Sequence, residues 1–170
     1  MTHANNEVEQ LIADMAQQLS QLIDGLPPED VVMIGIHSGG VWIAERLHKH
    51  LQLQQPLGEL DISFYRDDFS RIGMNPQVKP SKLPVSVEDK HIILVDDILH
   101  TGRTIRAAMN ELFDYGRPAT IKLVILGDRD GRELPIQADV IGKKLSLDEH
   151  EHVKLTGPDE LTLVVSTVVK

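Results

Sequence analysis

The sequence predicts an α/β domain with a central, mainly parallel sheet that is flanked by helices. Two observations carry this prediction. Two short apolar runs, 31–36 and 92–95, are each followed by a glycine-containing turn and an amphipathic helix. A third apolar run, 121–126, follows the second of these helices. Strands that alternate with helices form parallel sheets, and their carboxyl ends gather on one edge, where ligands bind.

A long amphipathic helix opens the chain. Its apolar residues recur with the period of a helix from about Asn6, and Asn5 or Asn6 can cap its start. Gly25 and the pair Pro27-Pro28 end it. We expect this helix to pack on the sheet. Its apolar residues are Val8, Leu11, Ile12, Met15, Leu19, Leu22 and Ile23.

The first strand, 31–36, leads into the turn His37-Ser38-Gly39-Gly40 and then into a helix that extends to about Leu51. Residues 60–64 alternate between apolar and polar, which is typical of a half-buried strand. The segment 69–86 is rich in glycine and proline and is expected to be a long loop. Loops of this length inside compact domains are usually functional or disordered.

The stretch 92–104 carries most of the chemistry. Four apolar residues form a strand that is expected to be buried on both faces, and Asp96 and Asp97 follow at its carboxyl end. The turn 100–104 comes next and contains Thr101, Gly102 and Thr104. The helix behind it has an apolar stripe and ends at Gly116. That stripe consists of Ile105, Ala108, Met109 and Leu112.

This order of residues suits a sugar phosphate. Backbone N–H groups at a turn and a helix start favour an anion, and Thr101 and Thr104 can add hydroxyl donors to a phosphate. Carboxylates cannot bind that phosphate, but they suit ribose hydroxyls or Mg²⁺. The sequence therefore points to a ribose-5-phosphate site. A receiver-like domain, in which an acidic pair after a strand holds Mg²⁺, is the alternative for the Asp96-Asp97 pair alone.

The remainder of the chain supplies a third strand end and an accessory region. The strand 120–126 ends at 127–132, which is expected on the same edge as the two earlier turns. Arg129 in this turn either contacts a ligand or forms a surface salt bridge with Asp128 or Asp130. The residues 153–155 and 161–169 are predicted strands on either side of the turn 156–159. The acidic and histidine-containing segment 148–152 is expected to be a solvated loop rather than a metal site.

The amino-acid composition limits which classes of protein are possible. The chain has 170 residues, of which 41% are apolar and 25% charged, and a formal net charge of −9. These values predict a single globular domain over residues 1–170. We see no apolar run long enough to span a membrane, no secretory signal and no cysteine, which together favour a cytoplasmic location. A net charge of −9 argues against nucleic acid as the principal ligand.

The run 92–104 resembles the phosphoribosyl diphosphate (PRPP) signature of type I phosphoribosyltransferases. The segments 59–68 and 128–136 narrow the resemblance to the PyrR family, which comprises pyrimidine-operon regulators that are also uracil phosphoribosyltransferases. The similarity extends from about Val31 to Leu155. It implies a type I phosphoribosyltransferase fold with a small hood, built from about 135–155, and a homodimer or larger homo-oligomer.

The resemblance also implies an activity and its residues. Uracil and PRPP would give UMP and diphosphate, with Mg²⁺ as cofactor. Asp96 and Asp97 would be the catalytic pair that holds the ribose hydroxyls, directly or through the metal, so that their contact with Mg²⁺ is indirect. The residues expected to bind PRPP or UMP are His37, Ser38, Gly39, Gly40, Arg66, His100, Thr101, Gly102, Arg103, Thr104 and Arg129.

The chain departs from the family pattern at two places. Ser38 and Gly39 stand where the family has threonine and arginine, and Asp130 and Gly131 stand where it has glycine and histidine. The alternative function implied by the family is a UMP-sensing, RNA-binding regulator with weak or no catalysis. The family's N-terminal helix supplies basic residues to the RNA-binding face, whereas this chain has no Lys or Arg before Arg46. Lys143, Lys144 and Arg106 remain as candidates for that face.

Overall fold

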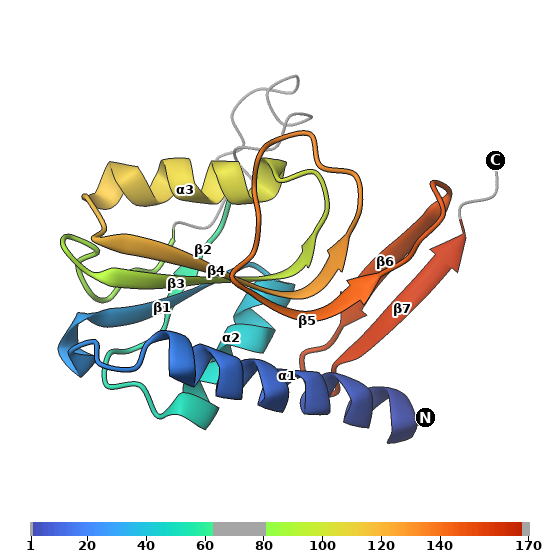
Figure 1. The fold of residues 1–170 in the computed structure, drawn as a ribbon, viewed down its shortest axis with the longest axis horizontal. Helices are drawn as coiled ribbons and strands as arrows, with labels where there is room; N and C mark the ends of the chain where they lie inside the picture. Colours follow the sequence, from blue (N-terminus) through green and yellow to red (C-terminus); the bar gives the residue numbers. More distant parts are fainter. Residues whose placement is uncertain (1, 63–80, 168–170) are drawn as a thin grey trace.

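The computed structural model describes residues 2–62 and 81–167. Five parallel strands form the central sheet in the order β2-β1-β3-β4-β5 (Figure 1). The predicted α/β fold with a parallel sheet is therefore confirmed. The strands are β1 (Val31–Ile36), β2 (Gly58–Leu60), β3 (His91–Leu99), β4 (Thr120–Arg129) and β5 (Val140–Leu145).

Helices cover both faces of the sheet. Figure 1 shows α1 (Thr2–Leu22) and α2 (Gly39–Leu51) on one face and α3 (Arg103–Tyr115) on the other. A short 3₁₀ helix, η1 (Pro28–Asp30), precedes β1. None of the helices in the described part of the chain is long and apolar enough to cross a membrane.

The apolar runs of the sequence form strands that are buried on both faces. Ile93 and Val95 of β3 pack with residues of α1 and α2, whereas Ile92 and Leu94 pack with residues of α3. This period of two is what a strand between two helical layers requires. Burial of each such side chain contributes about 1.5–3 kcal/mol to folding, so the sheet is a rigid base for the loops at its edge.

The order of the strands places the topological switch point of the sheet between β1 and β3. The chain leaves β1 through α2 and reaches β2 on one side, whereas it leaves β3 through α3 and reaches β4 on the other side. The two connections therefore diverge at the carboxyl ends of β1 and β3. Ligands of open α/β sheets bind at such a switch point.

A second, two-stranded sheet stands beside the first. The strands β6 (Glu151–Thr156) and β7 (Thr162–Thr167) pair antiparallel, close to the two strands predicted at 153–155 and 161–169. The range 135–155 that was expected to form a hood is thus divided, because β5 belongs to the central sheet and β6 pairs with β7. The treatment of the chain as one domain with a hood stays a prediction. Of the expected strand 60–64, only Leu60 lies in a strand, as the last residue of β2; residues 61 and 62 follow it without strand structure, and 63 and 64 lie outside the described residues. The expected loop 69–86 lies outside the described residues up to position 80, and its described part, 81–86, belongs to no helix or named strand.

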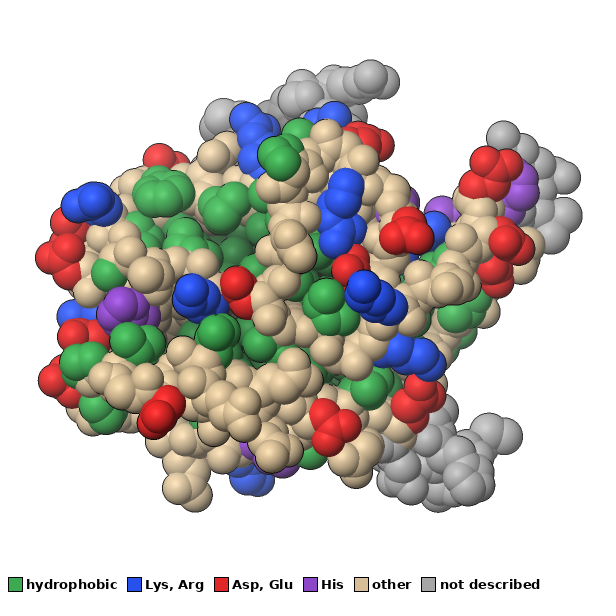
Figure 2. Space-filling model, viewed as in Figure 1, with side chains coloured by type: hydrophobic (Ala, Val, Ile, Leu, Met, Phe, Trp, Pro, Cys, Tyr) green, Lys and Arg blue, Asp and Glu red, His purple; other side chains and the backbone are tan. Residues whose placement is uncertain are grey.

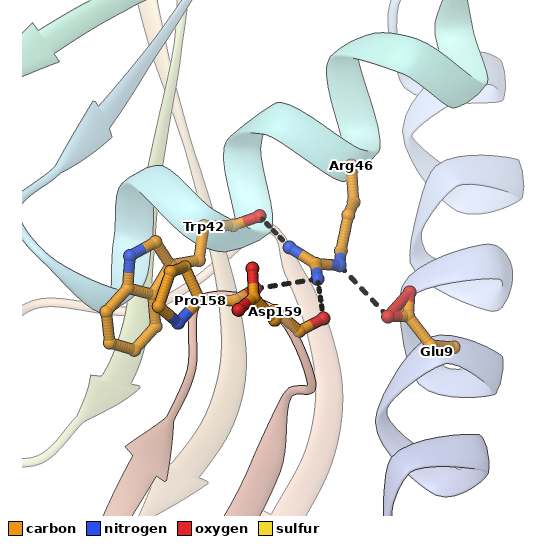
Figure 3. Close-up of polar contacts among 5 residues, drawn as sticks. All are labelled: Glu9, Trp42, Arg46, Pro158 and Asp159. Atoms are coloured by element: carbon orange, nitrogen blue, oxygen red, sulfur yellow. Dashed lines mark hydrogen bonds and ion pairs between the residues drawn. The ribbon is translucent and has the colours of Figure 1, made fainter.

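Arg46 of α2 joins this hairpin to the helical layer (Figure 3). Its Nη2 donates to the main-chain oxygens of Pro158 and Asp159 in the β6–β7 turn, at 3.0 and 3.1 Å. Its Nη1 donates to the oxygen of Trp42 at 3.1 Å, and its Nε donates to the Glu9 carboxylate of α1 at 2.9 Å. One guanidinium therefore connects α1, α2 and the turn of the hairpin.

We expect Arg46→Ala to lower the free energy of unfolding by about 2 kcal/mol, because it removes the donor from two turn carbonyls and one carboxylate. Arg46→Lys should retain part of the stability, since an ammonium keeps the charge without the planar fork. Urea unfolding followed by circular dichroism measures both. Arg106→Ala, at an exposed position on α3, is the matched control and should change stability by less than about 0.5 kcal/mol. Equal effects of Arg46→Ala and Arg106→Ala would contradict the role of Arg46.

Candidate functional site

The loops after β1, β3 and β4 meet at the carboxyl edge of the sheet. Gly39, the first residue of α2, lies against the side chain of Asp97 near the end of β3. His100, in the second loop, lies against Gly131 in the third. The structure thus brings together the segments 37–40, 96–104 and 127–132, which the sequence places far apart.

The first turn of α2 packs directly on the backbone of β3. A Cβ atom added at Gly40 would lie 2.5 Å from the Val95 oxygen and 3.0 Å from the Asp96 Cα. A Cβ atom added at Gly39 would overlap the Oδ2 atom of Asp97. Only residues without a side chain allow this approach, so the two glycines set the distance between α2 and the acidic pair.

The acidic pair lies inside β3 rather than after it, which corrects the sequence prediction. Pairing with β1 ends at Val95, but pairing with β4 continues through Asp96 and on to Leu99. Asp96 is buried, with 5% of its surface exposed. Its Oδ1 accepts the Asp97 N–H at 2.8 Å, and the Oδ1 of Asp97 accepts the Ile98 N–H at 2.7 Å. The backbone of the strand therefore fixes the orientation of both carboxylates.

Two helices begin at this site without a side-chain cap. The N-cap residue of α2 is Ser38 and that of α3 is Gly102, and neither position has a side-chain capping hydrogen bond. Thr101 Oγ1 accepts the Arg103 N–H at 3.2 Å. The positive ends of two helix dipoles thus lie on either side of the acidic pair, an arrangement that favours two anions.

The loop after β4 is tied to the turn 100–102. The N–H groups of Glu133 and Leu134 donate to the Thr101 oxygen at 2.9 and 3.1 Å. Arg132 pairs with Asp128 at 2.6 Å. Its guanidinium also donates to three main-chain oxygens, those of His100 (2.9 Å), Arg129 (3.0 Å) and Ile136 (2.8 Å). The sequence analysis assigned no role to Arg132, because most of its partners are backbone atoms of two different loops.

Arg129 does not form the surface salt bridge with Asp128 or Asp130 that was one of its two expected roles. Asp128 pairs instead with Arg132, and Arg129 Nη1 donates to the oxygen of Glu151 in β6 at 3.1 Å. The Nε atom of Arg129 is buried and has no hydrogen-bond partner among the described residues. A buried donor without a partner is unfavourable, so this atom is a candidate contact for a ligand.

Two further site residues have acidic partners. His37 Nε2 lies 2.6 Å from Glu59 Oε1, and Arg103 Nε donates to Glu133 Oε1 at 2.7 Å. Sequence reasoning missed both carboxylates because neither falls at a strand end. A hollow of about 620 Å³ borders His37 and Ser38 and is also lined by residues of α2 and by Pro158 of the β6–β7 turn. Arg66 lies outside the described residues, so its expected contact stays a prediction.

The donor set fits Mg²⁺ bound through water or substrate. No group of three or more His, Cys, Asp or Glu side chains capable of holding a metal occurs within residues 2–62 and 81–167, the segment 148–152 included. Asp96 and Asp97 are hard oxygen donors whose orientation the strand already fixes. Mg²⁺ keeps several waters and needs only one or two carboxylates beside substrate oxygens. These two residues would therefore hold the ion indirectly.

Comparison with known proteins agrees with this geometry. Residues 1–160 match the family described as phosphoribosyl transferase domain. A protein of Nitrosococcus oceani named bifunctional protein PyrR is 56% identical over 95% of this chain and 92% of its own length. A protein of the same name from Pseudomonas fluorescens is 54% identical over 91% of this chain and 92% of its own length. The chain belongs to the PyrR family of phosphoribosyltransferases.

Solved structures agree on the fold. A hypoxanthine phosphoribosyltransferase from Staphylococcus aureus superposes with a TM-score of 0.66 at 24% identity, covering 86% of this chain and 77% of its own. A hypoxanthine-guanine phosphoribosyltransferase from Bacillus anthracis gives 0.67 at 21% identity, covering 83% and 80%. The type I phosphoribosyltransferase fold expected from the sequence is confirmed. Membership of the PyrR family leaves the receiver-like interpretation of the Asp pair without support.

The contact between Gly39 and Asp97 generates a prediction. Gly39→Ala should displace the Asp97 carboxylate, because the new methyl group needs the space of Oδ2 while the strand holds Oδ1. Misplacement of a catalytic group by about 1 Å can cost on the order of 100-fold in rate, so we expect a loss of phosphoribosyl transfer of at least about 10-fold. Gly25→Ala, at a glycine with open space around it but with a φ of +85°, is the control: it should lower the free energy of unfolding and leave kcat/KM unchanged. A Gly39→Ala enzyme with wild-type kcat would show that Asp97 does not depend on this contact.

Proposed function

We propose that the protein transfers phosphoribose from PRPP to N1 of uracil and releases UMP and diphosphate. The observation that carries the proposal is the acidic pair between two uncapped helix starts. A ribose with a phosphate on one side and a diphosphate on the other matches two anion sites with hydroxyl acceptors between them. The choice of uracil rests on membership of the PyrR family.

Each part of the site has a role in this reaction. The turn 100–104, with Thr101 and Thr104, would bind the 5-phosphate. The turn 37–40 would meet the diphosphate, and Asp96 and Asp97 would hold the ribose hydroxyls. Bound Mg²⁺ would neutralise charge on the leaving diphosphate. Catalysis would consist mainly of positioning and of charge placement as positive charge develops on the sugar.

Titration of PRPP in the presence of Mg²⁺, followed by a screen of bases for nucleotide formation, tests the activity. We expect Asp97→Asn to lower turnover at least about 100-fold, because an amide cannot replace the carboxylate's charge. Its unfolding transition should stay close to that of the wild type. Asp24→Asn, at an exposed position after α1, is the control. Full activity of Asp97→Asn would refute the assigned role, and a wild type that forms nucleotide only with another base would refute uracil.

A regulatory activity is a second proposal, because the relatives bear the name bifunctional. The surface of the described residues offers limited support for RNA binding. Lys143 is paired with Glu7 of α1 at 2.7 Å, and on the face shown in Figure 2 basic side chains are interspersed with acidic ones. The helix α1 itself contributes no Lys or Arg. We therefore place catalysis first and RNA binding second.

A gel shift with a pyrimidine-operon leader RNA, at a stated salt concentration and with or without UMP, tests this order. We expect weak binding that UMP does not strengthen, because an RNA-binding protein needs free cations on one face. A Glu7→Gln variant should bind slightly more tightly, since it releases Lys143. Tight UMP-dependent binding without UMP synthesis would place RNA binding ahead of catalysis.

We also propose a homodimer or larger homo-oligomer and a cytoplasmic location.

A further inference from the structure

The turn 37–40 is attached to β2 at two points, both through His37. The His37 N–H donates to the main-chain oxygen of Leu60 at 2.9 Å, and His37 Nε2 lies 2.6 Å from Glu59 Oε1. A carboxylate only accepts hydrogen bonds, so this contact selects the form of the ring with a hydrogen on Nε2 and fixes the orientation of the ring. The backbone and the side chain of one residue of the turn are therefore both held by β2.

The strand β2 needs support of its own, because it has only three residues and forms an edge of the sheet. On its outer side, the Glu59 N–H donates to the Lys82 oxygen at 2.7 Å and the Lys82 N–H donates to the Glu59 oxygen at 2.8 Å. A Cβ atom added at Gly58 would lie 3.1 Å from Ile34 Cγ1 and 3.2 Å from Leu83 Cδ2. Glu59 is thus held between β1 and the residues 82–83.

Helix α3 in turn holds Ser81. The hydroxyl of Ser81 donates to Glu111 Oε1 at 2.6 Å and accepts the Asp61 N–H at 3.2 Å. Burial raises the pKa of the Glu111 carboxyl; the hydrogen bond from Ser81 opposes this shift, and the charges of Asp61 and Asp114 add to it. A half-buried carboxyl of α3 is therefore linked through one hydroxyl to the residue that follows β2.

These contacts form one path between the two ends of the candidate site. Helix α3 starts behind the turn 100–104, and its Glu111 holds Ser81. Ser81 and its neighbour hold the end of β2, and Glu59 of β2 holds His37. The helix behind the turn that would bind the 5-phosphate thus also supports the turn that would meet the diphosphate.

We propose that Glu59 is a positioning residue for the diphosphate end of the site. By holding the His37 imidazole, it keeps the turn 37–40 in the conformation that binds the diphosphate, while Ser81 and Glu111 support it from α3. This inference rests on the proposed transferase activity and adds to it a carboxylate that acts through His37 rather than on the substrate.

The charge of Glu59 alone predicts the opposite effect. Glu59 and Glu45 both line the hollow beside His37 and Ser38, and a carboxylate repels a nearby diphosphate. If Glu59 acted only through its charge, its removal would tighten diphosphate binding, as would removal of Glu45. If Glu59 holds His37, only its removal weakens that binding. The direction of the change therefore separates the two roles.

Isothermal titration with diphosphate in the presence of Mg²⁺, and separately with UMP, measures this direction. Glu59→Ala should raise the Kd of diphosphate roughly 10-fold, the usual effect of losing a hydrogen bond to a charged group. Glu59→Gln should recover most of the affinity, because its amide oxygen accepts the Nε2 hydrogen. The Kd of UMP should change little in both variants, since UMP carries no diphosphate. Glu45→Ala, at an exposed position of α2, is the matched control and should not weaken diphosphate binding.

A double-variant cycle tests whether Glu59 acts through His37. His37→Ala should weaken diphosphate binding at least as much as Glu59→Ala does. The variant with both changes should lose no more than His37→Ala alone, because the two changes remove one contact. Additive losses would show that Glu59 acts independently of His37 and would overturn the inference.

The α3 end of the path has a test of its own. Glu111→Ala should weaken diphosphate binding, whereas Glu111→Gln should not, because its amide oxygen still accepts the Ser81 hydroxyl. The pKa of Glu111 is raised in the folded protein, so its contribution to stability is lost as the pH rises above the ordinary value of 4.5. The unfolding free energy of the wild type should therefore fall relative to that of Glu111→Gln over this range.

The outcomes separate this inference from the proposed function. A wild type that binds diphosphate but forms no nucleotide overturns the proposed activity alone, and a wild type that binds neither PRPP nor diphosphate overturns both. An active wild type in which Glu59→Ala keeps its affinity for diphosphate overturns only the inference about Glu59. Equal losses of UMP and diphosphate affinity in Glu59→Ala would show a merely structural role and would overturn it as well.

Discussion

The site depends on the packing of the first turn of α2 against the backbone of β3. Gly39 and Gly40 lie so close to Val95, Asp96 and Asp97 that any side chain at these two positions would overlap the strand or its carboxylate. The approach places a positive helix end beside a negative pair. Each dipole interaction is worth only about 0.3–2 kcal/mol, so the fold contributes geometry more than binding energy.

The other side of the site, formed by the turn 100–102 and the loop after β4, is held in place by polar contacts instead. Arg132 donates to the His100 carbonyl of the turn 100–102. The same guanidinium donates to Asp128, Arg129 and Ile136 around the loop after β4, so it holds the turn against that loop. Partly buried networks of this kind fix one arrangement because each unpaired member is costly. A phosphate would therefore meet N–H groups that are already oriented, which reduces the entropy lost on binding.

The two departures from the family pattern share a physical character. At Gly39 the space of a side chain is taken by the Asp97 carboxylate, and at Gly131 it is taken by the His100 imidazole. In both cases a functional group of the β3 segment fills the volume that the family's arginine or histidine side chain would need to leave the backbone. Restoration of either family residue would require the neighbouring functional group to move.

The sequence by itself determined the strands β1, β3 and β4, the helices between them and the acidic pair, because burial between two helical layers leaves a periodic apolar pattern. The sequence analysis assigned the residues of β5 to the hood. Val140–Leu145 is an edge strand, and Gly142, Lys143 and Lys144 interrupt its apolar run, so the pattern of a buried strand is missing. Only the tertiary structure decided the partners of Arg46, Arg132 and His100. Those contacts join loops far apart in the chain through backbone atoms, and such contacts leave no periodic signal in the sequence.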